Sequence, residues 1–457
     1  MAFRLSGPFR LQEGLAGSTS RVRTNTAHYR ARDTISGGTH TQHLHTRTRA
    51  VRCSSLGGRR LQVHCGRVVG IDLGTSNSAI AVLNESGVPI IIPIDGGHPT
   101  MPSWAHYSKD GKVTVGRKAQ QRRIKDPLNT FHSVKRFIGR TFAECKEDIA
   151  NVGFEVVADE QGEATLVCPA LNCNLCPEEV SAEILIKMIQ DASDYLGEDI
   201  TKAVITVPAY FNDEQKDSTK MAGEAAGLEK VKILREPQAA ALAYGVNRDE
   251  DQTVMVFDLG GGTFDVAILE VGGGACEVLS TGGDAHLGGN DFDAAIMDWL
   301  IKEAQKKGVK VPRDNARAVE TLLQLSRAAR EDLSDNMETV IAIPTMAAPV
   351  LFTLTRNTLD FLLLELLRRM RLPMETCAFQ AGVDLTKQGD QSNGRGKAAA
   401  AGRQGVKMRR SGRNIDEILM VGGATRTPSV KRFVQNMSNI IPTEYAVNPD
   451  EAVALGA

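Results

Sequence analysis

The chain has no hydrophobic run long enough to cross a lipid bilayer. A membrane-spanning helix needs roughly 20 predominantly apolar residues, and the sequence of 457 residues contains no such run. The nearest candidate, Phe361 to Leu364, is followed by charged residues at positions 365, 368 and 369. We interpret this stretch as a packed helix of a globular protein. A chain of this length predicts two or more lobes, each with its own core.

Regularly spaced cysteines are also missing. Eight cysteines are scattered along the chain, which argues against a scaffold stabilised by disulfides. Cys173 and Cys176, with Cys168 nearby, leave a metal or redox site open as an alternative, but no second close pair completes four ligands. We expect these cysteines to lie in a loop before a helix over residues 178–196.

The first 66 residues contain no lysine and almost no acidic residues. Eleven arginines stand against Glu13 and Asp33, a net charge of +9, so the remainder of a chain with net charge −1 has about −10. A leader rich in arginine and hydroxyl groups and poor in acids is typical of an organelle transit peptide, and an apolar secretory core is missing. We expect residues 1–66 to be a transit peptide or disordered leader, and a disordered basic tail is the alternative.

From residue 68 onward, strand-like and helix-like segments alternate. Helical spacing of apolar residues predicts helices over 181–196 and 313–333. Short apolar segments predict the strands. A first set of three lies at residues 68–71, 79–83 and 89–92, and a second set lies at 254–257, 266–270 and 276–280. Two single segments lie at 203–208 and 418–421. The repeated three-strand opening indicates an α/β fold with mixed sheets in two related lobes.

One glycine-rich acidic turn follows the first strand of each set. The sequences are DLGTSN, starting at Asp72, and DLGGGTFD, starting at Asp258. Glycine lets backbone N–H groups approach phosphate oxygens closely. The carboxylates repel phosphate, so they imply a bridging hydrated cation such as Mg²⁺. Two such turns and a third at Gly422 and Gly423 predict a nucleotide held from both sides.

One segment fits neither lobe. Residues 387–413 have eight basic residues against Asp390 and no apolar periodicity. Such a composition does not form a packed core. We expect a disordered insert, and nucleic-acid binding is the alternative.

Eight motifs resemble the ATPase domain of the seventy-kilodalton heat-shock chaperones (DnaK type). In chain order they are GIDLGTSNSAIAV, NTFHSVKRFIGR, AVITVPAYFND, ILREPQAAALAYG, VFDLGGGTFDVAIL, HLGGNDFD, ILMVGGATRTPSV and VNPDEAVALGA. The resemblance extends from about Arg67 to Ala457 and is strongest to the plastid and cyanobacterial branch. It implies an actin-like ATPase fold with two lobes around a nucleotide cleft. The expected parts are lobe I at 67–250, lobe II at 251–445 and a return segment to lobe I at 446–457.

The resemblance also implies roles for particular residues. The expected catalytic residues are Lys135, Glu236, Asp258, Asp72 and Thr263. The expected nucleotide-binding residues are Gly74, Thr75, Ser76, Asn77, Gly260, Gly261, Gly262, Thr263, Arg330, Ser334, Gly422, Gly423, Arg426 and Asp450. Asp72 and Asp258 would hold Mg²⁺ through water, and a K⁺ site would include Asp265. Pro208 matches a proline that couples the nucleotide state to a partner domain.

Three residues, Arg327, Arg330 and Lys216, depart from the family pattern. Arg327 and Arg330 stand where the family usually has glutamate and lysine that hydrogen-bond the ribose. Arginine has no acceptor, so we expect weaker nucleotide affinity than in typical members. Lys216 replaces an arginine that contacts the partner domain, and lysine lacks the planar fork of arginine.

The expected function is ATP binding and hydrolysis by the nucleotide-binding domain of a chaperone that assists protein folding. The sequence stops at Ala457, where the family continues to a peptide-binding domain, so we expect no direct binding of unfolded clients. Cofactors are ATP or ADP, Mg²⁺ and K⁺, and expected partners are a J-domain co-chaperone and a GrpE-type exchange factor, without nucleic acid or membrane. We expect the chloroplast stroma, with the mitochondrial matrix as alternative. A non-hydrolysing regulator that titrates co-chaperones, and a sugar or glycerol kinase, remain as other functions.

Overall fold

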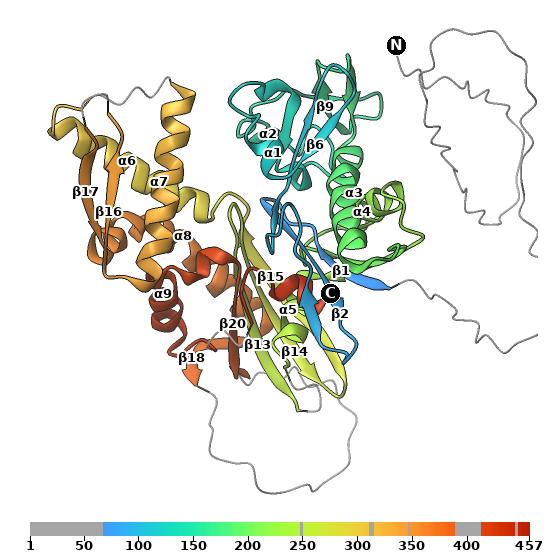
Figure 1. Ribbon diagram of the computed structural model, residues 1–457. Coiled ribbons are helices and arrows are strands. Elements are labelled where there is room, and N and C mark those ends of the chain that lie inside the picture. Colours follow the sequence, from blue (N-terminus) through green and yellow to red (C-terminus); the bar gives the residue numbers. More distant parts are fainter. Residues whose placement is uncertain (1–66, 247–249, 310–314, 346–347, 389–412, 444–446) are drawn as a thin grey trace, which may run out of the picture. The chain divides into compact units, whose positions relative to one another are not determined.

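Two mixed β-sheets form the framework of the computed structural model, which describes residues 67–246, 250–309, 315–345, 348–388, 413–443 and 447–457 (Figure 1). We call the part built on the first sheet lobe I and the part built on the second lobe II. The expected leader, residues 1–66, lies outside the described residues. No helix among those that are described is long and apolar enough to cross a membrane.

The sheet of lobe I has the order β12-β11-β1-β2-β3, and β4 pairs with β2. Strand β1 runs parallel to β11 and antiparallel to β2, so Asp72 at its end lies beside Thr206 of β11. The strands of this sheet are β1 Val68–Asp72, β2 Asn77–Leu83, β3 Pro89–Ile91, β4 Met101–Pro102, β11 Lys202–Val207 and β12 Lys230–Arg235.

The sheet of lobe II repeats this arrangement with the order β15-β14-β13-β20. Strand β13 runs parallel to β20 and antiparallel to β14, which sets Asp258 opposite Asp265. These strands are β13 Gln252–Leu259, β14 Phe264–Gly272, β15 Ala275–Asp284 and β20 Glu417–Val421. The repeated opening predicted from the sequence is therefore present in both sheets.

Smaller sheets and helices surround these two frameworks. In lobe I they are β5 Trp104–Tyr107, β6 Val113–Val115, β7 Thr130–His132, β8 Val156–Ala158, β9 Ala164–Cys168, β10 Cys173–Leu175, α1 Arg117–Gln120, α2 Lys146–Ile149, α3 Pro177–Leu196, α4 Asp213–Ala225, α5 Glu236–Ala243 and the 3₁₀ turns Pro127–Asn129 and Val134–Arg136. In lobe II they are β16 Glu338–Ile343, β17 Val350–Thr355, β18 Val383–Gln388, β19 Arg413–Ile415, α6 Gly289–Lys306, α7 Ala316–Asp335, α8 Arg356–Ala381, α9 Pro428–Ser438 and the 3₁₀ turn Gly423–Arg426. The last helix is α10 Ala452–Gly456.

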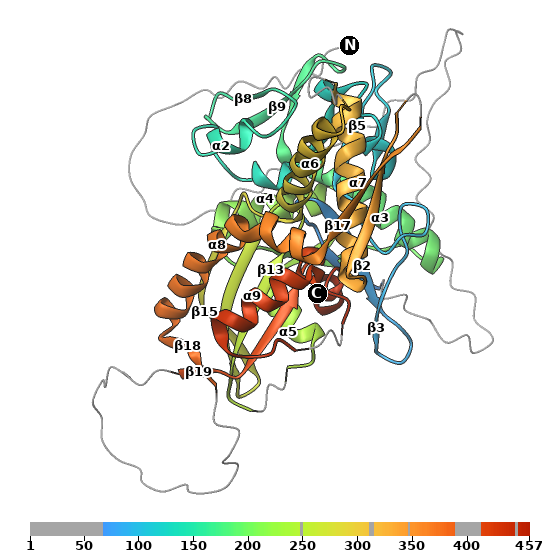
Figure 2. The same cartoon turned by 90° about the vertical axis from the view of Figure 1, so that its left-hand side faces the viewer.

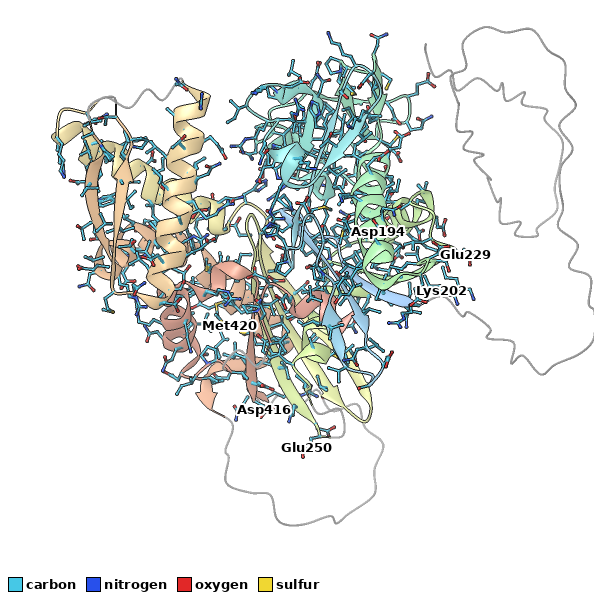
Figure 3. All side chains as sticks on the ribbon, in the orientation of Figure 1. Asp194, Lys202, Glu229, Glu250, Asp416 and Met420 are labelled. Atoms are coloured by element: carbon cyan, nitrogen blue, oxygen red, sulfur yellow. The ribbon has the colours of Figure 1, made fainter. Side chains whose placement is uncertain are left out.

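Two short helices of small residues join the two frameworks. Helix α5 packs against strands of both sheets, and α10 packs against α5, β1 and β2. A Cβ on Gly456 would lie 1.8 Å from the carbonyl oxygen of Ala239, so only glycine permits this approach. The Tyr244 hydroxyl, just after α5, donates to the carbonyl oxygen of Met420 at 2.8 Å, and Figure 3 marks Met420 on lobe II.

Helix α8 corrects one expectation. The segment from Phe361 to Leu364 is helical as predicted, but only part of it is packed. Leu363 is fully buried, whereas 77% of Phe361 and 42% of Leu364 are exposed.

The cysteine-rich segment differs from the expected loop. Cys168 and Cys173 lie opposite each other on β9 and β10, and Cys176 precedes the first residue of α3. Among the described residues, no group of three His, Cys, Asp or Glu side chains is arranged to hold a metal ion. The metal alternative for these cysteines gains no support from this arrangement.

The ends of the expected insert are strand residues. Strand β18 includes Lys387 and Gln388, and β19 begins at Arg413, pairing in parallel with β18. The remainder of the insert, residues 389–412, lies outside the described part of the chain.

Candidate functional site: a cleft between two glycine turns

The two glycine turns lie in contact with each other. A Cβ on Gly261, in the turn after β13, would lie 2.9 Å from the hydroxyl oxygen of Ser76, in the turn after β1. A Cβ on Gly74 would lie 2.0 Å from the carbonyl oxygen of Asn77, so the first turn requires glycine there. The two turns therefore approach closely because Gly261 has no side chain where it faces Ser76.

The third glycine turn closes over the end of β13. Gly422 has a φ of 81°, and a Cβ there would lie 2.3 Å from the carbonyl oxygen of Leu259 and 2.7 Å from a carboxylate oxygen of Asp258. A Cβ on Gly423 would lie 2.3 Å from a carboxylate oxygen of Asp450. Both positions need glycine for steric reasons.

These turns surround a cleft with a volume of about 130 Å³ that opens to solvent. The lining contains most of the residues expected from the sequence, namely Asp72, Gly74, Thr75, Ser76, Asn77, Lys135, Pro208, Glu236, Asp258, Gly260, Gly261, Gly262, Thr263, Asp265, Gly422, Gly423 and Asp450. Segments from across the chain thus contribute to one site.

Several buried carboxyl groups lie close together in the cleft. Burial, with the charge of Glu236, raises the pKa of Asp72 to about 7 and that of Asp265 to about 7, although Lys135 opposes both shifts. Burial and the charges of Glu236, Asp265 and Asp72 also raise the pKa of Asp258 well above its ordinary value. Carboxylates held so close together favour a bound cation, which would stabilise their charged forms.

Lys135 is the cation that these carboxylates face. Its ammonium donates to a carboxylate oxygen of Glu236 at 2.6 Å, and only 8% of the residue is exposed. Glu236 is the first residue of α5, followed by Pro237, so it is both a helix N-terminal acid and part of the cleft. One lysine therefore faces four acidic side chains, those of Asp72, Glu236, Asp258 and Asp265.

The donor chemistry fits a hydrated divalent cation. Hard oxygen ligands suit Mg²⁺, which keeps several of its waters in protein sites. In the described part of the chain, no group of three His, Cys, Asp or Glu side chains is arranged to hold an ion directly. Asp72 and Asp258 are therefore suited to contact such an ion through water.

Three expected nucleotide-binding residues do not line the cleft. Arg330 is buried and donates to Asp293 at 2.7 Å, while the carbonyl of Ser334 accepts from Arg356 at 2.7 Å. The guanidinium of Arg426 donates to side chains of Asn448 and Asp450. Arg330 lies near the second turn, because a Cβ on Gly289 would be 3.5 Å from its Nη2.

Arg327 joins the same buried acid. Its Nε donates to Asp293 at 3.0 Å and its Nη2 donates to Asn290 at 2.9 Å. Asp293 is only 2% exposed, and each of its carboxylate oxygens accepts a hydrogen bond from one arginine. The two substituted positions noted in the sequence form one structural unit.

A network around Asp148 was missed by the sequence interpretation. Arg136 donates to the carbonyl of Gly262 at 3.0 Å and pairs with Asp148 at 3.1 Å, and His286 Nε2 lies 3.0 Å from Asp148. Burial alone would raise the pKa of Asp148, but the hydrogen bond from Arg140 and the charge of Arg136 lower it. The network connects the second glycine turn and the segment after β15 to lobe I. The adjacency of Arg136 to Lys135 was the one feature that could have indicated it.

Comparisons with known proteins agree on one family. A family model described as "Hsp70 protein" matches residues 68–388 and 407–457. The chaperone protein dnaK of Guillardia theta is 42% identical over 398 residues, which cover 86% of this chain and 59% of that protein.

Two plant relatives have similar scores of identity. The stromal 70 kDa heat shock-related protein, chloroplastic, of Pisum sativum is 42% identical over 407 residues, 88% of this chain and 53% of the relative. Heat shock 70 kDa protein 6, chloroplastic, of Arabidopsis thaliana is 44% identical over 398 residues, 86% of this chain and 51% of the relative. The chain thus spans between half and three fifths of the length of these relatives.

The family match and the two mixed sheets confirm the actin-like α/β fold that the motifs implied. Both the family model and relatives above 40% identity cover most of the described residues. The chain belongs to the Hsp70 family.

Proposed function

We propose that the chain binds ATP in the cleft and hydrolyses it to ADP and phosphate, as the nucleotide-binding part of a plastid chaperone. The observation that supports this most strongly is the contact between the two glycine turns, where Gly261 faces the Ser76 hydroxyl. Backbone N–H groups from both turns can then hold the phosphates of one nucleotide from opposite sides.

In this proposal Lys135 and Glu236 act on the reacting groups. The ammonium of Lys135 neutralises charge on the γ-phosphate, and Glu236 orients the attacking water. The two side chains pair at 2.6 Å, and both residues line the cleft. Hydroxyls of Thr75, Ser76 and Thr263 add hydrogen-bond donors to the phosphates.

Asp72 and Asp258 would hold Mg²⁺ through its waters, and Asp265 would take part in a K⁺ site. Bound Mg²⁺ would offset phosphate charge. The raised pKa values of Asp72 and Asp265 support a cation here, because an ion would relieve the repulsion among these acids.

The nucleoside would lie against the third glycine turn. Gly422 and Gly423 line the cleft there, and the planar guanidinium of Arg426 can stack on a base. Arg330, Ser334 and Asp450 would surround the ribose and base. Lobe I at 67–250, lobe II at 251–445 and the return segment at 446–457 are the proposed domain boundaries.

Partners and location follow from the family. We infer a J-domain co-chaperone and a GrpE-type exchange factor as partners. Lys216, on exposed helix α4, pairs with Asp213 at 2.9 Å and would contribute less to interdomain signalling than an arginine. Relatives named as chloroplastic support a plastid location, and we propose the stroma.

Single-turnover hydrolysis of radiolabelled ATP tests the activity. We expect Lys135→Met to slow hydrolysis by about 100-fold or more, since removal of one preorganised charge costs about 10²–10³ in rate. Lys109→Met, which removes an exposed lysine outside the cleft, is the matched control and should leave the rate unchanged.

The alternative is a regulator that binds nucleotide without turnover. It is motivated by Arg327 and Lys216, which both depart from the family pattern. Tight ATP binding without measurable, Lys135-dependent hydrolysis would support the regulator and contradict the ATPase.

A further inference from the structure

Two cysteines face each other across the hairpin of β9 and β10. Cys168 is the last residue of β9, Cys173 is the first residue of β10, and the two are partners in the antiparallel register. Side chains of directly opposite residues lie on the same side of a sheet. Strand β9 is the middle strand of the sheet β10-β9-β8, and Figure 2 shows it beside β8. The fold therefore sets two thiols side by side at the base of a short loop.

The spacing of these two positions suits a disulfide. Opposite residues of an antiparallel pair have Cα atoms about 4.5 or 5.5 Å apart, depending on the hydrogen-bonding pattern. A disulfide joins residues whose Cα atoms are roughly 4.4–6.8 Å apart. Both spacings lie inside that range, so the bond requires no large movement of the backbone. Cys168 and Cys173 are both free thiols in this structure.

The loop between the two cysteines is held by its own hydrogen bonds. The backbone N–H of Leu171 donates to the carbonyl oxygen of Cys168 at 3.2 Å, and Asn172 has a left-handed φ of 52°. The backbone N–H of Ala170 donates to the side-chain oxygen of Asn129 at 2.7 Å. These contacts keep the strand ends in register and the two sulfurs as neighbours while the thiols are reduced.

The two thiols differ in their access to solvent. Cys168 is fully buried, whereas Cys173 is half-buried against the core of lobe I. Burial raises the pKa of Cys168, and so does the charge of a Cys173 thiolate, as expected for neighbouring sulfurs. Burial and the charge of Glu179 raise the pKa of Cys173. Cys173 is thus the thiol that a reagent in solution reaches first, and its reaction should be faster at pH 8 than at pH 7 because only the thiolate attacks.

We propose that Cys168 and Cys173 form a reversible disulfide site that fixes the β9–β10 hairpin when a disulfide oxidant reacts with it. The Cys173 thiolate attacks one sulfur of the oxidant, forms a mixed disulfide and releases one thiol. The Cys168 thiolate then attacks the Cys173 sulfur and releases the second thiol. The pair gives up two electrons and two protons, and the disulfide of the oxidant takes them up as two thiols.

The hairpin supports the segment that leads to Lys135. Asn129, which holds the hairpin loop, ends the 3₁₀ turn Pro127–Asn129, and β7 and the turn with Lys135 follow it directly. Neither cysteine lines the cleft. The bond therefore acts on the support of this segment and leaves the nucleotide site open.

Treatment of the full chain with glutathione disulfide tests the pairing. Remaining free thiols are blocked in denaturant, disulfides are then reduced, and the released thiols take a second label that tandem mass spectrometry maps. Cys168 and Cys173 should take the second label together, and peptides analysed before reduction should have no glutathione on either. Dithiothreitol should restore both thiols.

Two serine variants separate this pair from the third cysteine of the segment. Cys176 is exposed and precedes α3, outside the paired strands, so Cys176→Ser is the matched control and should retain the disulfide. Cys173→Ser should slow the oxidation of Cys168 about tenfold or more, since a buried thiol is not reached directly. Circular dichroism verifies that both variants are folded. A disulfide between Cys173 and Cys176, glutathione retained on Cys173, or two thiols that stay free would overturn the proposal.

Hydrogen exchange measures whether the bond fixes the hairpin. Closing the loop removes conformations from the opened hairpin, so amide exchange over residues 166–175 should slow about tenfold in the oxidised protein. Cys173→Ser, treated in the same way, should show no slowing. Equal exchange in oxidised and reduced wild type would contradict a bond that fixes the hairpin.

Discussion

The environment of Asp293 explains Arg327 and Arg330, two of the residues that depart from the family pattern. Asp293 is buried and bonded by Arg327 on one oxygen and Arg330 on the other. A buried carboxylate is tolerated when each oxygen is paired. The arginines therefore stabilise a local network, and Arg327 has no acceptor to offer a ribose because a guanidinium only donates.

This network leads to a prediction on nucleotide affinity. Arg327→Gln supplies an acceptor without placing a second carboxylate beside Asp293. We expect it to tighten ADP binding about threefold to tenfold, since one hydrogen bond contributes about 1 kcal/mol. Isothermal titration calorimetry measures the change. Arg317→Gln, an exposed arginine of the same helix, should have no effect, and equal affinity of wild type and Arg327→Gln would refute the prediction.

His132 makes a prediction on acid stability. Its ring stacks on Trp104 with centroids 4.2 Å apart, and burial, with the charges of Arg123 and Arg136, lowers its pKa from 6.5 to about 4. As the pH falls, the unfolded chain takes up this proton first. The stabilising contribution is complete above pH 6.5 and is lost as the pH falls toward 4.

Replacement of His132 by phenylalanine should remove this contribution to acid sensitivity. Between pH 7 and 4.5, the free energy of unfolding should fall less for His132→Phe than for the wild type. The difference should reach up to about 3 kcal/mol, because one pKa unit corresponds to about 1.4 kcal/mol. Urea titrations at several pH values compare the two proteins. Parallel pH profiles would show that His132 is not responsible.

At the scale of elements, the contact between the two glycine turns is a steric requirement. An added Cβ on Gly261 meets the Ser76 hydroxyl at 2.9 Å, whereas one on Gly153 meets nothing within 4 Å. We expect Gly261→Ala to separate the turns and weaken ATP binding about tenfold, since overpacking costs about 1–3 kcal/mol. Gly153→Ala is the matched control. Calorimetry measures the ATP affinity of each variant. An affinity of Gly261→Ala equal to that of the wild type would mean that the contact between the two turns does not contribute to ATP binding.

The main strands and the glycine turns could be predicted because their causes are local. A short apolar run and a terminal Asp-x-Gly motif specify β1 and β13 without reference to the remainder of the chain. The motifs also indicated which residues meet in the cleft. The Asp148 network could not be predicted, because Arg136, Asp148 and His286 come from distant segments and meet only in the folded chain.

The outer face of α8 shows the same limit. Helical periodicity predicts one buried face, and Leu363 follows that expectation. Periodicity does not state whether a second apolar face is covered within the chain or by another molecule. The exposure of Phe361 and Phe379 answers that question only for the single chain.

At the scale of the whole molecule, the two sheets have the same strand arrangement, and each ends in an acidic turn. Asp72 is the last residue of β1 and Asp258 is the second-last residue of β13, so equivalent carboxylates from each lobe line one cleft. This arrangement explains how one metal–nucleotide complex could join the two lobes. Hydrolysis would then change the contacts that hold them together.

Mg²⁺-dependent ATP binding tests this central claim most directly. Calorimetry should show that Mg²⁺ tightens ATP binding by the wild-type chain at least tenfold over the same protein in EDTA. Asp72→Asn and Asp258→Asn should each remove most of that gain, while Asp110→Asn, an exposed acid outside the cleft, should retain it. Binding that is indifferent to Mg²⁺, or unchanged in both cleft variants, would contradict a metal–nucleotide site shared by the two turns.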